Sequence, residues 1–169
     1  MKRMLCLIMI VFSLFGFSAC SSSVNMEKLT EYQRGNFRAE AHITLDGVKY
    51  KTVIEKSGEN VSFSFTEPQE LADFVFIVNE TGVFLKTDGL NVPINAGEEL
   101  LKLSHFEKLF DVPIVGTWKI EKSSPGGVSV YVCENESAGA LLYIDAGSHL
   151  PLKIVCGGAE ADIISFEIK

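Results

Sequence analysis

The sequence predicts a mainly β domain of the α+β class, in which a strongly curved antiparallel meander forms an incomplete β-barrel closed by one or two helices. Three observations predict it: strict alternation of apolar and polar residues near the start of the domain, turn-forming residues after every strand, and one amphipathic helix between two groups of strands. Roughly ten antiparallel strands cannot lie as one flat sheet, because twist accumulates from strand to strand. The sheet must therefore curl.

The first three strands form a meander. Residues 37–46 alternate almost perfectly, with Phe37, Ala39, Ala41, Ile43 and Leu45 on one face. Asp46-Gly47 is a strong hairpin signal, and residues 48–56 supply the partner strand. A turn at 57–60 leads to a third strand over 61–66, in which Val61, Phe63 and Phe65 share a face.

The next strands are shorter and more apolar. Pro68 ends the third strand, because proline has no N–H to donate to a ladder. Residues 74–79 then form a strand whose odd and even positions are both apolar, so both of its faces must be covered. Thr81-Gly82 turns the chain into a strand over 83–86, which Asp88-Gly89 ends.

One helix is predicted over residues 96–110. Asn95 can cap its first turn together with Glu98, and Asp111 and Pro113 end it. An apolar stripe recurs at three- and four-residue spacing: Leu100, Leu103, Phe106, Leu109 and Phe110. This stripe is expected to cover the doubly apolar strand. A second, short helix is expected within residues 24–34.

Five strands complete the chain, over residues 118–122, 128–134, 141–145, 152–156 and 162–168. Cys133 and Cys156 fall on the first and third strands of a meander, roughly 10 Å apart across the strand between them. Outside the cytoplasm two cysteines can pair, which would require another strand order. The alternative is two small buried thiols.

The N-terminus predicts export and lipidation. Lys2 and Arg3 precede an apolar run from Met4 to Phe17, which is shorter than the roughly 20 residues that span a bilayer. Ser18 and Ala19 then stand before Cys20, the small residues that a lipoprotein signal peptidase accepts before a diacylglycerol-modified cysteine. Phe17 stands where a lipobox usually has Leu.

Three segments follow from this interpretation: a lipoprotein signal peptide at 1–19, a lipidated polar linker at 20–25 and one domain at 26–169. Cys20 is expected to anchor the exported chain to the outer face of the cell membrane, with two or more acyl chains making the attachment lasting.

The net negative charge of the chain argues against nucleic acid as a partner. Without Lys2 and Arg3 the 15 basic residues fall to 13, against 22 acidic ones, and an acidic exterior disfavours nucleic acid.

The sequence offers no catalytic or metal motif. His42, His105 and His149 are scattered over a strand, a helix and a turn, and no serine lies in a Gly-x-Ser-x-Gly elbow. No enzyme activity, cofactor or metal is predicted.

The order of several segments resembles small Gram-positive lipoproteins with a LolA-like fold. These segments are Phe63-Ser64-Phe65-Thr66-Glu67-Pro68, Leu71, a Phe-rich strand, Asp88-Gly89-Leu90, an amphipathic helix, and Leu142-Tyr143-Ile144-Asp145 followed by His149-Leu150-Pro151-Leu152-Lys153-Ile154. The resemblance spans residues 37–169 and includes the lipoprotein-localisation factors LolA and LolB and the mycobacterial lipid-binding lipoproteins LppX and LprG.

In that family an incomplete barrel closed by helices takes acyl chains in an apolar cavity. The resemblance implies that Phe63, Phe65, Phe76, Leu85, Leu103 and Phe106 line such a cavity here. LolA itself is soluble and shuttles between membranes, whereas an anchor on Cys20 argues against shuttling. The basic residues by which such carriers meet their transporters have no counterpart in this sequence.

Two functions are therefore expected as alternatives. In the first, the half-barrel binds a lipid or other apolar molecule, as a carrier or a sensor. In the second, it is a non-catalytic scaffold with a filled core that recruits another envelope protein. A cavity of several hundred Å³ lined by the phenylalanines would favour the first, and a filled interior the second.

Overall fold

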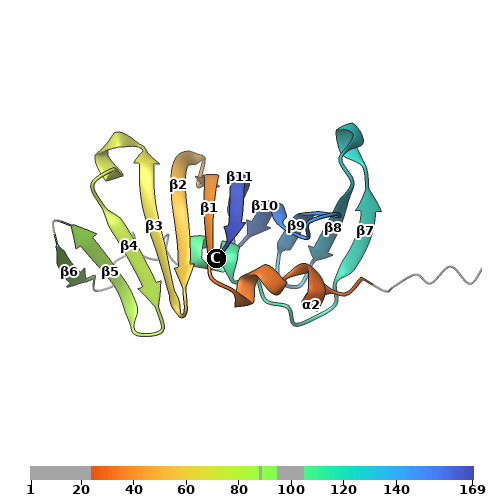
Figure 1. Ribbon diagram of the computed structural model, residues 1–169, viewed down its shortest axis with the longest axis horizontal. Helices are drawn as coiled ribbons and strands as arrows, with labels where there is room; N and C mark the ends of the chain where they lie inside the picture. Colours follow the sequence, from red (N-terminus) through yellow and green to blue (C-terminus); the bar gives the residue numbers. More distant parts are fainter. Residues whose placement is uncertain (1–23, 88, 95–104) are drawn as a thin grey trace, which may run out of the picture.

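The chain folds around one curved sheet. A computed structural model describes residues 24–87, 89–94 and 105–169, and Figure 1 shows the sheet running the length of the molecule. The sheet has 11 antiparallel strands in the order β6-β5-β4-β3-β2-β1-β11-β10-β9-β8-β7. It is curved without closing into a barrel, since β6 and β7 remain at opposite ends (Figure 1). The predicted fold class is confirmed.

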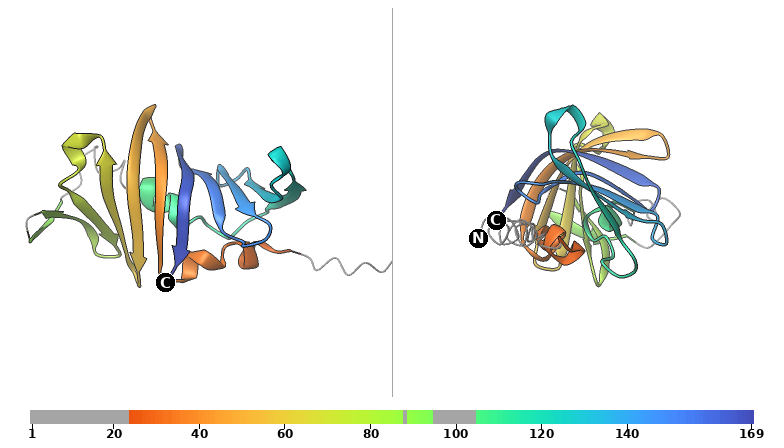
Figure 2. Two further views of the ribbon diagram at one scale, coloured as in Figure 1. Left: turned by 45° about the horizontal axis from the view of Figure 1, so that its top comes forward. Right: turned by 90° about the vertical axis from the view of Figure 1, so that its right-hand side faces the viewer.

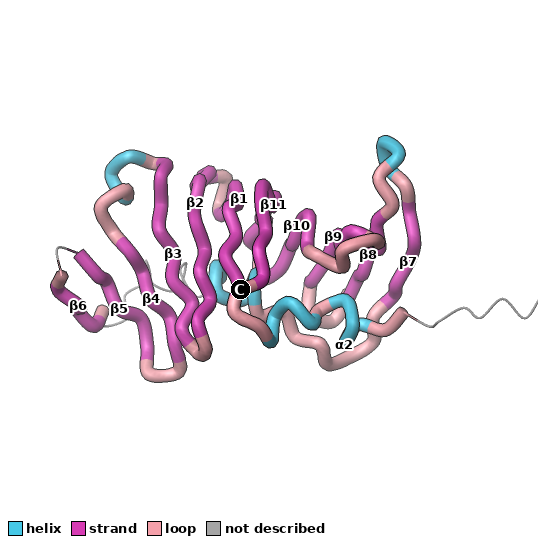
Figure 3. The backbone as a smooth tube through the Cα atoms, viewed as in Figure 1, coloured by secondary structure: helices cyan, strands magenta, loops and turns pink. Residues whose placement is uncertain are grey.

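The strands have four to ten residues each. They are β1 (Phe37–Leu45), β2 (Val48–Ser57), β3 (Asn60–Glu67), β4 (Val75–Asn79), β5 (Gly82–Thr87), β6 (Leu90–Pro93), β7 (Lys119–Ser123), β8 (Val130–Asn135), β9 (Ala140–Asp145), β10 (Pro151–Cys156) and β11 (Ala159–Ile168) (Figure 3). Helical segments are α2 (Met26–Leu29), the 3-10 turns η1 (Glu31–Arg34), η2 (Gln69–Leu71) and η3 (Pro125–Gly127), and residues 105–110.

The predicted strands are all present, and β6 is an additional one. β6 has four residues and ends at Pro93, which an edge strand tolerates. The expected N-terminal helix is α2 followed by η1, with Asn25 capping α2 by accepting a hydrogen bond from the Lys28 N–H. Of the predicted helix 96–110, residues 105–110 are helical, while Asn95, Glu98 and Leu103 lie outside the described residues, as does Asp88.

Two consecutive meanders meet at the middle of the sheet. β1 to β6 form one and β7 to β11 the other, and β1 pairs with β11 from Phe37–Ile168 to Leu45–Ala159. The register shifts at Glu40/Ala41, where β11 carries Ile164 as an extra residue. This bulge keeps Phe166 on the buried face opposite Ala39 although Ile163 already faces Ala41.

The core lies on the concave face. In Figure 2 the strands arch over α2, η1 and the helical residues 105–110, which lie on one side of the sheet. Tyr32 of η1 meets Phe166 edge-on at 5.4 Å, and Phe37 lies between Phe166 at 4.8 Å and Phe110 at 5.8 Å. The central strands are therefore covered by both helical segments.

The helical residues 105–110 also approach the turn between β10 and β11. Gly157 adopts a positive φ of 61°, and a Cβ built there would lie 3.2 Å from His105 Nδ1. Glycine suits this position both for its backbone and for the close approach.

The two cysteines of the domain are free and buried. β9 lies between β8, which carries Cys133, and β10, which carries Cys156, as the sequence predicts. Burial raises the pKa of Cys156 and raises that of Cys133 to about 11. Of the two alternatives that the sequence leaves open, a disulfide or two buried thiols, the structure therefore shows the two buried thiols.

Candidate apolar binding face

An apolar row crosses the sheet from its filled centre toward its β6 end. Residues paired directly across neighbouring antiparallel strands share a face, and the registers align Ile54, Phe63, Phe76, Leu85 and Val92 on β2 to β6. Ile54 also pairs with Ala39 of the core, so this row lies on the concave face. We call these five residues the concave row; the strands that carry them, β2 to β6, follow one another across the sheet in Figure 1.

Exposure rises along the concave row. Ile54 and Phe63 are fully buried, Phe76 and Leu85 are half-buried, and Val92 is 47% exposed. Leu90 lies two residues before Val92 on the same face of β6 and is 64% exposed. Apolar side chains thus continue beyond the filled core onto an accessible part of the sheet.

The buried part of this region is filled with aromatic rings. Phe106 lies 6.0 Å from Phe63, 5.9 Å from Phe65 and 5.4 Å from Tyr50, measured between ring centroids. Phe65 meets Phe76 edge-on at 5.8 Å and Tyr50 at 5.7 Å. These contacts pack the helical residues 105–110 directly onto β2 and β3.

The structure brings together four of the six predicted cavity residues. Phe63, Phe65 and Phe106 are buried against one another, and Phe76 contacts Phe65. Leu85 is half-buried and pairs with Phe76, so it extends the same surface. Leu103 lies outside the described residues.

Sequence reasoning missed three residues of this region. Val92 and Leu90 belong to β6, which was not predicted, and Tyr50 was assigned only to a strand. The alternation of Leu90 and Val92 around Asn91, directly after a Gly turn, was the signal that could have revealed them.

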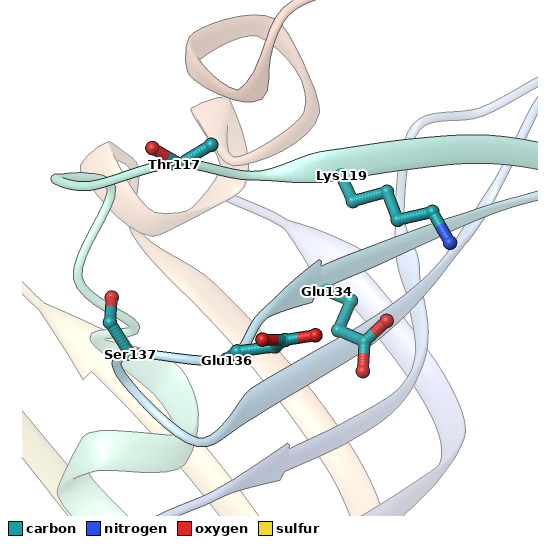
Figure 4. Close-up of a pocket in the computed structure, with 5 residues that line it drawn as sticks. All are labelled: Thr117, Lys119, Glu134, Glu136 and Ser137. Atoms are coloured by element: carbon teal, nitrogen blue, oxygen red, sulfur yellow. The ribbon is translucent and has the colours of Figure 1, made fainter.

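A polar hollow lies at the other end of the sheet. It encloses about 580 Å³ and is lined by Thr117, Lys119, Glu134, Glu136 and Ser137 (Figure 4). Lys119 forms an ion pair with Glu121 at 2.9 Å, and this carboxylate raises the Lys119 pKa. The hollow contains none of the predicted apolar residues.

The described residues contain no cluster of three or more His, Cys, Asp or Glu side chains placed to hold a metal ion. Within the same ranges no helix is both long enough and apolar enough to cross a membrane.

Solved structures share this architecture at low sequence identity. A conserved protein from Thermus thermophilus superposes with a TM-score of 0.53 at 13% identity, over 85% of each chain. A LolA superfamily protein from Nitrosomonas europaea has a TM-score of 0.42 at 12% identity, over 87% of this chain and 94% of its own.

A third similar structure is the Pseudomonas aeruginosa MucA/MucB complex. It has a TM-score of 0.45 at 14% identity, over 84% of this chain and 55% of that one. No protein-family model and no curated protein matches the sequence. The likeness to the Thermus protein supports the fold class alone.

Proposed function

We propose that this protein is an exported lipoprotein, anchored through Cys20 at the outer face of the cell membrane, that binds a lipid acyl chain or similar apolar ligand on the concave face of its sheet. The concave row carries the proposal: its exposure rises from buried Phe63 to Val92, which is 47% exposed. Such a surface offers an apolar ligand contact without requiring the central core to open.

The shape of the sheet supports an acyl chain as the occupant. From Phe63 on β3 to Val92 on β6 the concave row crosses three strand spacings of about 4.8 Å, so this part provides a strip roughly 14 Å long. Each methylene that leaves water on such a strip contributes about 0.8 kcal/mol. An acyl chain that covers the whole strip therefore gains several kcal/mol against the cost of association.

The experiment uses protein carrying Cys20→Ser, so that an acyl group on the anchor cannot compete. Native mass spectrometry after mild purification would reveal bound lipid, and a dansylated undecanoic acid would report affinity by fluorescence. Leu85→Glu and Val92→Glu are each expected to weaken probe binding at least tenfold, because the carboxylate opposes an apolar ligand.

Leu152→Glu is the matched control. Leu152 is an exposed leucine on β10, 38% accessible and outside the concave row, so its variant should bind the probe normally. Val92→Glu alters an already exposed side chain and therefore separates lost binding from lost folding. Protein that lacks co-purified lipid and does not bind the probe would overturn the proposal, as would Leu85 and Val92 variants that bind like the control.

A second function remains a competing proposal: a scaffold that recruits another envelope protein. The packing of Phe63, Phe65 and Phe106 into one aromatic cluster favours it, because these three residues leave no room for a ligand among themselves. Loss of acyl-probe binding combined with a co-purified envelope protein would favour this function over the first.

A further inference from the structure

The convex face of β3 to β5 carries a second surface, which faces away from the concave row. The registers align Glu55, Ser62, Ile77, Phe84 and Pro93 on β2 to β6, one residue out of phase with the concave row. β4 and β5 are thus apolar on both faces, as the sequence predicts for residues 74–79. Ile77 and Phe84 remain half-buried rather than covered.

A hollow of about 350 Å³ lies over this pair of side chains. Its floor is Ile77 and Phe84, and its other lining residues are all polar: Glu55, Ser57, Asn60, Ser62, Asn79 and Asn91. This hollow combines an aromatic and an aliphatic side chain with a rim of amides and hydroxyls, whereas the concave row is apolar throughout. The residues come from β2 to β6 and the β2–β3 turn, so the sheet itself positions them.

Hydrogen bonds orient part of the rim. Asn79 Nδ2 donates to Asn60 Oδ1 at 2.8 Å, while Asn79 Oδ1 accepts from the Thr81 N–H at 3.0 Å and the Thr81 hydroxyl at 2.6 Å. The Asn79 amide is therefore held in one orientation at the edge of the hollow.

The carboxylate of the rim is ionised and already paired with two cationic side chains. Glu55 accepts from Arg38 at 2.6 Å and from Lys169 at 3.2 Å, and these two hydrogen bonds lower the Glu55 pKa. The remaining polar lining is made of amides and hydroxyls, so the hollow offers no net charge to attract an ionic ligand.

We propose that this hollow binds one ring of a neutral oligosaccharide. A pyranose presents C–H groups on one face, which suit the electron-rich face of the Phe84 ring, and hydroxyl groups around its edge. The Asn91 amide can both donate to and accept from a sugar hydroxyl, while Asn60 and Asn79, whose oxygens already accept hydrogen bonds, can offer their remaining amide N–H groups as donors. An acyl chain would leave these rim groups desolvated without partners, and it would gain nothing from them.

The test is titration calorimetry and saturation-transfer NMR with chitotetraose and cellotetraose, which distinguish an N-acetylated ring from a plain hexose. Binding of either sugar is expected. Phe84→Leu keeps an apolar floor but removes the aromatic face, and Asn91→Ala removes one rim amide. Each should weaken binding about threefold to tenfold.

Tyr143→Leu is the matched control, because Tyr143 is a half-buried aromatic residue on the same convex face, on β9. Circular dichroism melting of all variants reports whether each is folded. Absence of binding to both sugars at millimolar concentration would overturn the proposal, as would equal binding by folded Phe84→Leu, Asn91→Ala and control proteins. Because the acyl-probe assay uses the opposite face, either proposal can fail without the other.

Discussion

Individual polar side chains hold the irregular segments onto the sheet. Asn135 is fully buried at the end of β8, donates from Nδ2 to the Val115 carbonyl at 3.2 Å, and accepts from the Ser137 hydroxyl at 2.7 Å and the Ala138 N–H at 3.1 Å. The Gln33 amide faces the backbone of Val112; oriented with its nitrogen toward the carbonyl and its oxygen toward the N–H, it makes two hydrogen bonds of 3.3 and 3.2 Å. The segment that follows the helical residues 105–110 is thus fixed at two points.

Replacing Asn135 with alanine should destabilise the domain. The Val115 carbonyl and the Ala138 N–H would lose their partner in a partly buried site, which costs about 1 kcal/mol in the free energy of unfolding. Denaturant unfolding followed by circular dichroism measures it. Glu136→Ala, at the exposed neighbouring position, is the control, and an Asn135→Ala protein as stable as that control would contradict the assignment.

Asp145 should give the domain a specific loss of stability in acid. The Ser148 N–H and hydroxyl and the Gly147 N–H donate to its Oδ1, and these bonds lower the Asp145 pKa. A carboxylate whose pKa is lower in the folded state stabilises at neutral pH, and that contribution is lost as pH falls below about 4.

Unfolding of wild-type and Asp145→Asn protein across pH 3–7 tests this expectation. The stability difference should be present at pH 7 and should shrink toward pH 3. Glu59→Gln, at the exposed β2–β3 turn, controls for general charge effects. A difference that is constant across pH would show that the hydrogen bonds do not depend on the ionised carboxylate.

For single residues, the sequence predicted which strand face is buried better than it predicted which side chains contact each other. Alternation placed Phe37, Ala39, Ala41, Ile43 and Leu45 together, and all five are buried. It could not identify Asn135 as a buried anchor, because an asparagine before Glu136 and Ser137 has the composition of an ordinary exposed turn. The distinction depends on Val115, which lies 20 residues away and contacts it only through the fold.

Among the strands, the packing of β11 depends on its β-bulge. The extra residue Ile164 is 52% exposed, and it sets Phe166 against Phe37 and Tyr32. Without the bulge, the alternation of β11 would direct Phe166 to the convex face.

Phe166→Ala should cost about 3 kcal/mol in the free energy of unfolding, because it removes the ring that packs on Phe37 and Tyr32. Deleting Ile164 should be milder, because it removes the extra residue and leaves Phe166 opposite Ala39 and Ile163 opposite Ala41 in plain alternation. Thermal unfolding of both variants measures the contrast. An Ile164 deletion as damaging as Phe166→Ala would show that the bulge itself is needed for the packing of β11.

Strand prediction succeeded where a marked turn was followed by a long alternation and failed where the alternation was short. Asp46-Gly47 and Gly157-Gly158 marked two hairpins, and both are present. β6 was missed because four residues ending in Pro93 give too short an alternation, although its pairing with β5 is clear in the structure. The bulge at Ile164 was also missed, although the apolar positions change from odd numbers, Ala161 and Ile163, to even numbers, Phe166 and Ile168, on either side of it.

For the whole molecule, the curved open sheet follows from the number of strands and their twist, but the order in which the strands pair does not. A simple meander would leave β1 at an edge, whereas β1 and β11 pair at the centre and join two meanders. That contact links residues more than 100 positions apart, and no local pattern specifies it.

The proposed anchor would determine where the whole molecule acts. If Cys20 carries the lipid, Cys20→Ser protein should leave the membrane fraction, because no acyl chain then holds it. Cell fractionation with immunodetection measures this, and Ser21→Ala is the adjacent control. Mature-size Cys20→Ser protein that stays firmly in the membrane would contradict lipidation at this residue.

If the chain is exported N-terminus first, as proposed, the central pairing of β1 with β11 would also set the order in which the domain folds. β1 to β6 can form hairpins as they emerge, but Ala39 and Ile43 lack their β11 neighbours until residues 159–168 have been delivered. A secretion channel would therefore handle an incomplete domain until nearly the last residue. A premature stop codon that removes β11 should leave an exposed apolar seam in the middle of the sheet, which makes the product a substrate for envelope proteases rather than a shortened functional protein.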